Sequence, residues 1–444
     1  KIYGKRKPTF FYFNKLNVHF LVRPKRIVIV GGGFVGINAA KKLGGKENVE
    51  VKLIDRRNYH LFQPLLYQVA AAGLSPAEIA VPIRSLLSFY KNTKVILDEI
   101  TSINLNEKCV YGKESSYPYD YLILAAGATH NYFGNEKWEI NAPGLKTIAQ
   151  ATEIRRRIMT AFEKAEITED SSERKRNLTF VVVGGGPTGV ELAGAIGEMT
   201  RFTLAKDFRN IDPKLTRIIL AEAGNRILPG FDEDLSSRAT RDLESIGVQV
   251  WTESPVTDVD NTSVKVGGEN ISTATVIWAA GVKASKIGDS IDVEKDPQGR
   301  IKIAPDLTLP GNPEVFVAGD LAHCKGVNGD PLPSIAPVAI QQGRYIAKSI
   351  LNRINSKTTE DFNYMDKGQM ATIGRKKAIV QSFGFKFGGF IAWLAWLFIH
   401  ILYLSGFKNR ILVLIQWGYS YFSFARGARL IVDRNWRLFS KEKA

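Results

Sequence analysis

The chain has 444 residues, of which 45% are hydrophobic and 23% charged, so its composition excludes a disordered or fibrous protein and suits more than one folded domain. The formal net charge is +16, but the basic excess gathers at the two ends. Residues 1–26 contain eight basic residues and no acidic ones, and residues 408–444 contain eight basic residues against Asp433 and Glu442. Because a long apolar stretch precedes the second group, we expect an anionic lipid surface as partner and no nucleic acid.

Cysteine and histidine usage excludes several chemistries. Only Cys109 and Cys324 are present, too far apart for a disulfide scaffold, a cysteine-ligated metal site or a redox dithiol. Cys324 is interpreted as a small buried thiol rather than a catalyst. The five histidines have no ligand spacing, so no metal is predicted.

The first predicted unit opens with a short apolar strand over residues 26–30. The strand ends in a G-x-G-x-x-G turn at Gly31, Gly33 and Gly36 and continues into a helix, and a second strand ends at Asp55. This spacing permits a tight turn, close approach of a pyrophosphate and close packing of helix on strand, while the acid can accept hydrogen bonds from a ribose. A dinucleotide site is predicted here.

The same pattern recurs later in the chain. An apolar strand ends at residue 183, and Gly184, Gly186 and Gly189 repeat the spacing. The next acid at the end of a strand, Glu222, follows 38 residues after Gly184, which indicates an insertion in the crossover. Two such units are much less expected by chance than one.

Three further strands complete these units. Two of them close on the glycines Gly127 and Gly281, and the third follows Thr308 and ends at Gly319 and Asp320. The predicted fold class is therefore α/β, with two Rossmann-like dinucleotide-binding domains, the second inserted in the first, and a C-terminal membrane-anchoring helical region. The expected boundaries are 24–145 with 285–345 for the first domain, 146–284 for the second, and 346–444 for the C-terminal region, after a basic extension over 1–23.

Four stretches resemble the type II NADH dehydrogenases, a family of flavoproteins with two dinucleotide-binding domains. They read DRRNYHLFQPLLYQVAAAGLSP (55–76), GGGPTGVELAG (184–194), WAAGVKAS (278–285) and IAPVAIQQGRYIA (335–347). The resemblance implies non-covalent FAD in the first domain and NADH as substrate in the second. The implied FAD-binding residues are Gly31, Gly33, Gly36, Asp55, Gly127 and Asp320, and the implied NADH-binding residues are Gly184, Gly186, Gly189, Glu222 and Gly281.

The resemblance also implies three catalytic residues, Glu191, Gln341 and Lys377. Glu191 matches an acid near the flavin and nicotinamide, although a first-turn carboxylate that only complements the helix dipole is the alternative. Gln341 matches the last glutamine of the motif A-Q-x-A-x-Q, but Pro337 stands in place of the first. Lys377, with its neighbour Lys376, matches a basic position near the quinone, and a solvated strand end is the alternative.

The charge of Glu222 is expected to disfavour a 2′-phosphate and so to select NADH over NADPH. Arg226 lies close by in the sequence and would weaken that preference.

Residues 387–407 form an apolar stretch of 21 residues without Asp, Glu, Lys or Arg. The length allows one transmembrane helix, but Gly388, Gly389 and His400 interrupt it. Residues 411–425 are too short and too polar to cross back, and basic residues flank them, which favours helices lying in the membrane interface. Burial in a core or dimer interface is a third reading. Residues 1–23 fit a targeting leader, an added extension or a basic membrane-contacting arm.

These observations predict a membrane-associated enzyme that oxidises NADH through FAD and reduces a membrane quinone in electron transport, without pumping protons. The expected location is the cytoplasmic face of a bacterial membrane or an organelle equivalent, and a homodimer is left open. The alternative functions are a flavin reductase that serves a protein acceptor and a slow flavin redox sensor. A sulfide:quinone oxidoreductase would need active cysteines that this chain lacks.

Overall fold

The computed structural model describes residues 23–205, 207–423 and 426–432. Apart from residue 23, the predicted basic extension lies outside them. The first sheet has the strand order β20-β21-β9-β1-β2-β5. Its strands are β1 (Lys25–Val30), β2 (Val49–Asp55), β5 (Thr93–Leu97), β9 (Tyr121–Leu124), β20 (Thr308–Leu309) and β21 (Asn312–Val317). The pairs of β1 with β2 and β9, and of β21 with β9, are parallel.

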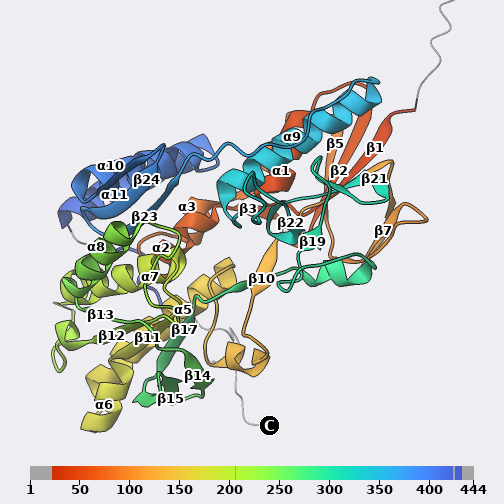
Figure 1. The fold of residues 1–444 in the computed structure, drawn as a ribbon. Helices are drawn as coiled ribbons and strands as arrows, with labels where there is room; N and C mark the ends of the chain where they lie inside the picture. Colours follow the sequence, from red (N-terminus) through yellow and green to blue (C-terminus); the bar gives the residue numbers. More distant parts are fainter. Residues whose placement is uncertain (1–22, 206, 424–425, 433–444) are drawn as a thin grey trace, which may run out of the picture.

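Two helices far apart in the sequence lie side by side against this sheet (Figure 1), namely α1 (Phe34–Leu43) and α9 (Ala336–Ile354). Their approach depends on Gly343, where a Cβ atom would lie 2.4 Å from the carbonyl oxygen of Val35. Shorter elements surround this unit: β3 (Tyr59–Leu61), α2 (Leu66–Ala70), α3 (Pro76–Ile79), β4 (Ala80–Pro82), α4 (Ile83–Leu87), β6 (Ile100–Asn104), β7 (Cys109–Gly112), β8 (Ser116–Pro118), β19 (Ile301–Lys302) and β22 (Ala322–His323).

The second sheet has the order β13-β12-β11-β17, with every pair parallel. Its strands are β11 (Thr179–Val183), β12 (Arg217–Ala221), β13 (Val248–Trp251) and β17 (Thr275–Trp278), and its helices are α5 (Ile148–Ile167), α6 (Ser171–Asn177), α7 (Pro187–Glu198) and α8 (Glu233–Glu244). A small antiparallel sheet follows, made of β14 (Val256–Val259), β15 (Ser263–Val266) and β16 (Glu269–Ser272). The all-buried strand β11 is typical of a parallel sheet covered on both faces.

Two chain segments connect the units and pair with each other. They are β10 (Ala128–His130) and β18 (Val282–Ala284), which run antiparallel. The first sheet takes its strands from residues 25–124 and 308–317, and the second from residues 179–278. The α/β fold class with a second nucleotide-binding unit is confirmed, and the residue boundaries of the domains stay a prediction.

The C-terminal part is a three-stranded antiparallel sheet followed by two helices: β23 (Gln369–Gly374), β24 (Lys377–Ser382), β25 (Phe385–Gly388), α10 (Phe390–Tyr403) and α11 (Phe407–Ser423). Figure 1 shows α10 and α11 with β24 at one end of the molecule, next to α7 and α8. The long apolar stretch is thus divided, since Gly389 and Gly406 take φ values of +88° and +87° on either side of α10. In the described part of the chain, no helix is long and apolar enough to cross a membrane.

Candidate active site

The two glycine turns share one geometry. Gly31 and Gly184 both have φ of +108°, a backbone conformation that favours glycine. A Cβ atom at Gly36 would lie 1.9 Å from the carbonyl oxygen of Gly31, and Gly189 stands in the same relation to Gly184. The first and third glycines of each motif are therefore required by the turn and by close packing of helix on strand.

The second glycine of each motif faces open space. A Cβ atom added at Gly33 or Gly186 would meet no other atom within 4 Å. These residues cap the N-termini of α1 and α7, whose unpaired N–H groups and positive dipole ends point outward there. Each turn thus offers an open cradle that fits the pyrophosphate of a dinucleotide.

An acid stands beside each turn in the same arrangement. Asp55 Oδ2 accepts a hydrogen bond from Gly32 N at 2.6 Å, and Glu222 Oε2 accepts one from Gly185 N at 2.6 Å. Asp55 is the last residue of β2 and Glu222 directly follows β12, so each acid lies at the edge of its sheet where a ribose would bind. Arg226 does not face Glu222, because its guanidinium donates to the carbonyl oxygens of Phe231 at 2.8 Å and Pro229 at 3.0 Å.

The remaining predicted cofactor residues lie at strand ends. Gly127 and Gly281 have φ of +70° and +68°, and no atom lies near the position of a Cβ at Gly127. Asp320 pairs with Lys146, Nζ to Oδ2 at 3.2 Å, and both side chains are largely buried. The preceding Gly319 N donates to the buried Gln342 Oε1 at 2.7 Å. The glycine turn, Asp55, the open Gly127 and the paired Asp320 fit an extended dinucleotide such as FAD.

A cavity of about 130 Å³ lies between α7, α2 and the C-terminal helices. That volume is close to the roughly 150 Å³ of a cavity that holds one benzene ring. Aromatic side chains form much of the lining, and a few charged groups converge on it. The lining residues are Tyr67, Gln68, Gly73, Glu191, Ala195, Glu198, Phe202, Thr203, Thr372, Ile373, Gly374, Arg375, Trp393, Trp396, Leu397, Trp417, Ser420, Tyr421 and Arg426.

Glu191 lines this cavity and is 9% exposed. Its Oε1 accepts from Thr372 N at 3.5 Å, a long hydrogen bond that does little to stabilise a charge. Burial raises the pKa of Glu191 to about 8. The carboxyl is therefore mostly neutral at pH 7, unlike a solvated first-turn carboxylate that complements a helix dipole.

A hydrogen-bonded chain joins three other lining residues. Trp417 Nε1 donates to Gln68 Oε1 at 2.8 Å, and Gln68 Nε2 donates to Tyr67 Oη at 3.0 Å. Because Gln68 donates to Tyr67, the hydroxyl proton of Tyr67 is not used in that bond. Burial raises the pKa of Tyr67 well above its ordinary value, so its hydroxyl stays protonated and can donate into the cavity.

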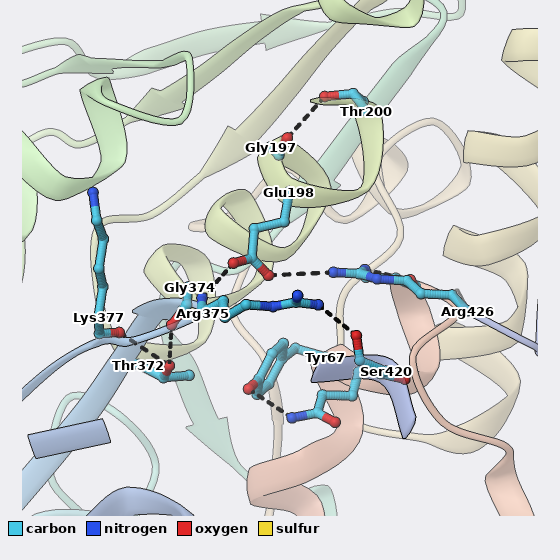
Figure 2. Close-up of polar contacts among 12 residues, drawn as sticks. Tyr67, Gly197, Glu198, Thr200, Thr372, Gly374, Arg375, Lys377, Ser420 and Arg426 are labelled. Atoms are coloured by element: carbon cyan, nitrogen blue, oxygen red, sulfur yellow. Dashed lines mark hydrogen bonds and ion pairs between the residues drawn. The ribbon is translucent and has the colours of Figure 1, made fainter. Parts of the chain in front are cut away.

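Two arginines and one glutamate among the lining residues form a cluster of charged groups (Figure 2). Glu198 accepts from Arg375 N and pairs with Arg426, NH2 to Oε2 at 3.5 Å. Arg375 also donates to the carbonyl oxygens of Ser420 at 2.6 Å and Tyr421 at 2.7 Å, near the end of α11. Arg426 NH1 donates to Ala71 O at 2.8 Å, beyond the end of α2. Burial lowers the pKa of both arginines, yet both remain cations at neutral pH.

Two of the predicted catalytic residues do not line the cavity. Gln341 forms a reciprocal pair of hydrogen bonds with the backbone of Met365, each 3.0 Å long. Lys377 points away from the cluster around Glu198 (Figure 2) and pairs with Asp242 at 3.3 Å and with Ser245 Oγ. Lys376 Nζ lies 5.3 Å from the centre of the Tyr421 ring. Catalytic roles for Gln341 and Lys377 stay a prediction.

Several cavity residues were not singled out from the sequence. Tyr67 and Gln68 belong to the stretch 55–76 that carries the family resemblance, which was the signal available for them. Arg375, directly before Lys376, and Trp417, within the second apolar stretch, had no such signal. They reach the cavity only through the folding of the C-terminal part on α7.

Both cysteines are buried and free, and burial raises the pKa of Cys324, as suits an inert thiol. Among the residues described, no group of three or more His, Cys, Asp or Glu side chains has the arrangement of a metal site.

Comparison with known proteins first defines the class. Residues 25–343 match the pyridine nucleotide-disulphide oxidoreductase family, and residues 367–426 match the NDH2 C-terminal domain. A structure of NDH2 from Plasmodium falciparum in complex with NADH superposes with a TM-score of 0.83 at 22% identity, covering 93% of this chain and all of that one. The sulfide:quinone oxidoreductase of Aquifex aeolicus superposes with a TM-score of 0.69 at 17% identity, covering 87% of this chain and 91% of that one. The fold is thus that of flavin-dependent pyridine-nucleotide oxidoreductases.

Sequence identity narrows the class. A type II NADH:quinone oxidoreductase of Mycobacterium tuberculosis is 44% identical over 428 residues, covering 93% of this chain and 91% of that protein. One from Staphylococcus aureus is 30% identical over 370 residues, covering 81% and 90%. The chain therefore belongs to the type II NADH:quinone oxidoreductases, and the predictions of an NADH-oxidising, quinone-reducing enzyme and of FAD as its cofactor are confirmed.

Proposed function

We propose that the quinone headgroup binds in the aromatic cavity and that NADH binds along the second glycine turn, with Glu191 between the two sites. The observation that carries this proposal is the position of the cavity. One wall is α7, whose N-terminus forms the NADH-side cradle, and the other walls are α2 and the C-terminal helices. A ring-sized space with one neutral carboxyl and one hydroxyl donor suits a flat ligand with carbonyl groups at its edge.

Bound FAD would supply the redox chemistry, as acceptor of a hydride from NADH and donor of two electrons to the quinone. The side chains of this chain supply position and hydrogen bonds. In the proposal, the hydroxyl of Tyr67 donates a hydrogen bond to a quinone carbonyl. Gln68 and Trp417 hold Tyr67 in place. The neutral carboxyl of Glu191 holds a proton beside the cavity, and the indole walls exclude water.

The apolar surface of α10 and α11 is proposed to lie on a lipid bilayer, parallel to its plane. Large apolar side chains of both helices are exposed, namely Phe390, Ile391, Leu394, Phe398, Leu402, Phe407, Ile411, Leu412, Leu414, Ile415, Tyr419 and Phe422. An exposed apolar surface of this extent marks a membrane or protein contact. The basic residues Lys408 and Arg410 at the start of α11 favour an anionic lipid surface. This arrangement would let a quinone enter the cavity from the membrane, where it dissolves.

The test separates the two half-reactions. The FAD-loaded enzyme is mixed anaerobically with NADH, then with a short-chain quinone, while the flavin absorbance is followed. We expect the absorbance to fall with NADH and to recover rapidly with quinone. In Tyr67→Phe the fall should be unchanged and the recovery about tenfold slower, because one hydrogen bond to the substrate is lost.

The matched control is Tyr345→Phe, which removes a hydroxyl that donates to Glu360 O on the surface of α9. This variant should behave as the parent does. An equal recovery rate in Tyr67→Phe and the parent would place the quinone outside the cavity. A fall with no recovery in the parent would indicate a protein acceptor instead.

A further inference from the structure

The hairpin of β24 and β25 closes in a tight turn that holds an unusual residue. Ser382 pairs directly with Phe385, so the turn consists of Phe383 and Gly384 alone. Their φ values of +49° and +81° are those of a type I′ turn. This turn favours Asn or Asp at its first position, since a bulky side chain with positive φ crowds its own backbone. Phenylalanine at position 383 therefore lowers the stability of the hairpin.

Packing does not offset this cost. Phe383 is 72% exposed and Phe385 is 71% exposed. A Cβ atom at Gly384 would meet no atom within 4 Å, so the turn projects beyond its neighbours. Two neighbouring aromatic rings held in water are unfavourable for a soluble fold and indicate a contact made with something else.

The base of the hairpin is fixed to the rest of the molecule. Ser382 Oγ donates to Lys367 O at 2.7 Å, and Gln381 Oε1 accepts from Asp232 N at 2.9 Å. On the next strand, Lys386 pairs with the carboxylate of Asp232. These contacts hold the hairpin in one direction, so the two rings stay exposed instead of folding back onto the protein.

The turn continues the apolar surface of the C-terminal helices. α10 begins only two residues after β25, and its first two residues, Phe390 and Ile391, are exposed. We propose that the hairpin tip, residues 383–385, is a further lipid-contacting element that places the rings of Phe383 and Phe385 among the lipid headgroups beside α10. This inference rests on the proposed membrane attachment of α10 and α11.

A bilayer suits this tip better than a second copy of the chain does. A stable protein interface buries roughly 1,200 Å² or more, far beyond what a two-residue turn with one flanking ring provides. Aromatic rings, by contrast, are enriched individually at the depth of the headgroups.

The first test is Phe383→Asn in the FAD-loaded, full-length enzyme. Asparagine suits the type I′ turn, so the midpoint of thermal unfolding should rise. Partition into vesicles of equal parts phosphatidylcholine and phosphatidylglycerol should nevertheless weaken about tenfold, because one buried phenylalanine ring is lost. The control is Phe89→Asn, which removes a phenylalanine that is 90% exposed in the first nucleotide-binding unit and should leave partition unchanged.

The second test detects contact directly. Since both native cysteines are buried, a single cysteine in Phe383→Cys can be labelled with an environment-sensitive fluorophore. Vesicles should shift its emission to the blue, whereas the same label in Phe89→Cys should show no shift.

The outcomes separate this inference from the proposal on which it rests. If Phe398→Asp on α10 releases the enzyme from vesicles while Phe383→Asn does not, the hairpin inference fails and the membrane attachment stands. If neither variant changes partition and no blue shift occurs, both fail. If Phe383→Asn lowers the unfolding midpoint together with partition, the phenylalanine serves folding, and the inference is overturned.

Discussion

At the scale of single residues, the buried carboxyl of Glu191 predicts a pH dependence. Its pKa of about 8 means that the carboxyl is neutral below that pH and charged above it. If the proton is needed beside the substrate, quinone reduction should decline as the pH rises through about 8. In Glu191→Gln, a neutral side chain of the same shape, this decline should disappear. The rate of each half-reaction, measured from about pH 6 to about pH 9, checks this expectation.

The raised pKa of Glu191 also predicts how the free energy of unfolding depends on pH. The folded-state pKa lies above the ordinary value of 4.5, so the folded protein binds the proton more tightly than the unfolded chain does. The stability due to this proton is complete below the unfolded pKa and is lost as the pH rises toward 8, by about 1.4 kcal/mol per pH unit. In Glu191→Gln, the free energy of unfolding measured with urea should fall less as the pH rises toward 8. An equal loss in both proteins would mean that Glu191 is solvated and charged at pH 7.

The residues that are easiest to recognise in a sequence are those fixed by local geometry. Gly31, Gly36 and their counterparts occupy positions where the turn itself excludes a side chain, and Glu222 stands beside its turn as Asp55 does. Lys377 shows the limit of prediction from local sequence, because its partner Asp242 on α8 is 135 positions away. No spacing rule relates two such residues, so the direction of the lysine side chain could not be predicted.

At the scale of elements, Arg375 joins the hairpin of β23 and β24 to the end of α11. Its guanidinium donates to two carbonyl oxygens in the last turn of that helix, those of Ser420 and Tyr421. In Arg375→Met we expect faster amide hydrogen exchange in the last turn of α11 and a loss of stability of about 2 kcal/mol. Quinone reduction should slow because Tyr421 lines the cavity, while flavin reduction by NADH should be unchanged.

The control for this prediction is Lys376→Met, which removes the neighbouring cation without removing a hydrogen bond to α11. Its exchange pattern should match that of the parent. Arg375→Lys should restore only part of the protection from amide hydrogen exchange. An ammonium group cannot bind two carbonyl oxygens with the forked geometry of a guanidinium. Unchanged exchange at residues 419–423 in Arg375→Met would show that α11 is held by its apolar packing alone.

The C-terminal stretch shows why element boundaries were harder to predict than element types. Hydropathy indicated one run of 21 residues, but the chain enters it in a β-strand and passes Gly389 with positive φ before α10 starts. The strand cannot be recognised locally, because Phe385 and Phe387 acquire strand geometry by pairing with β24. Trp396 and His400 are buried, whereas Phe398 is exposed, so α10 has one face toward the protein and one away.

At the scale of the whole molecule, the order of the chain predicted the fold because each nucleotide-binding unit carries its own complete motif. What no local motif describes is the packing of the C-terminal part against both units. Asn409, near the start of α11, donates to the carbonyl oxygens of Ala77 and Glu78 in the first unit, while Arg375 binds Glu198 in the second. The cavity exists only where these three parts meet.

Two buried histidines, one in the first unit and one in α10, predict how the whole molecule responds to acid. His60 Nδ1 lies 2.9 Å from Gly32 O in the first glycine turn, and His400 stacks on Trp396 within α10. Burial lowers the pKa of each to about 4, below the ordinary 6.5, so the unfolded chain binds these protons first as the pH falls. The stability associated with each neutral ring is complete above pH 6.5 and is lost between about pH 6.5 and 4, at about 1.4 kcal/mol per pH unit.

The double variant His60→Asn and His400→Asn isolates this effect, because asparagine can keep a side-chain N–H near the position of Nδ1 without titrating. Urea unfolding free energies of parent and variant, compared between about pH 6.5 and about pH 5, avoid the range in which most carboxylates take up protons. Glu191 acts in the opposite direction over this range but equally in both proteins. The parent should therefore lose up to about 2.7 kcal/mol more per pH unit than the variant. Parallel curves would show that water reaches both rings in the folded protein.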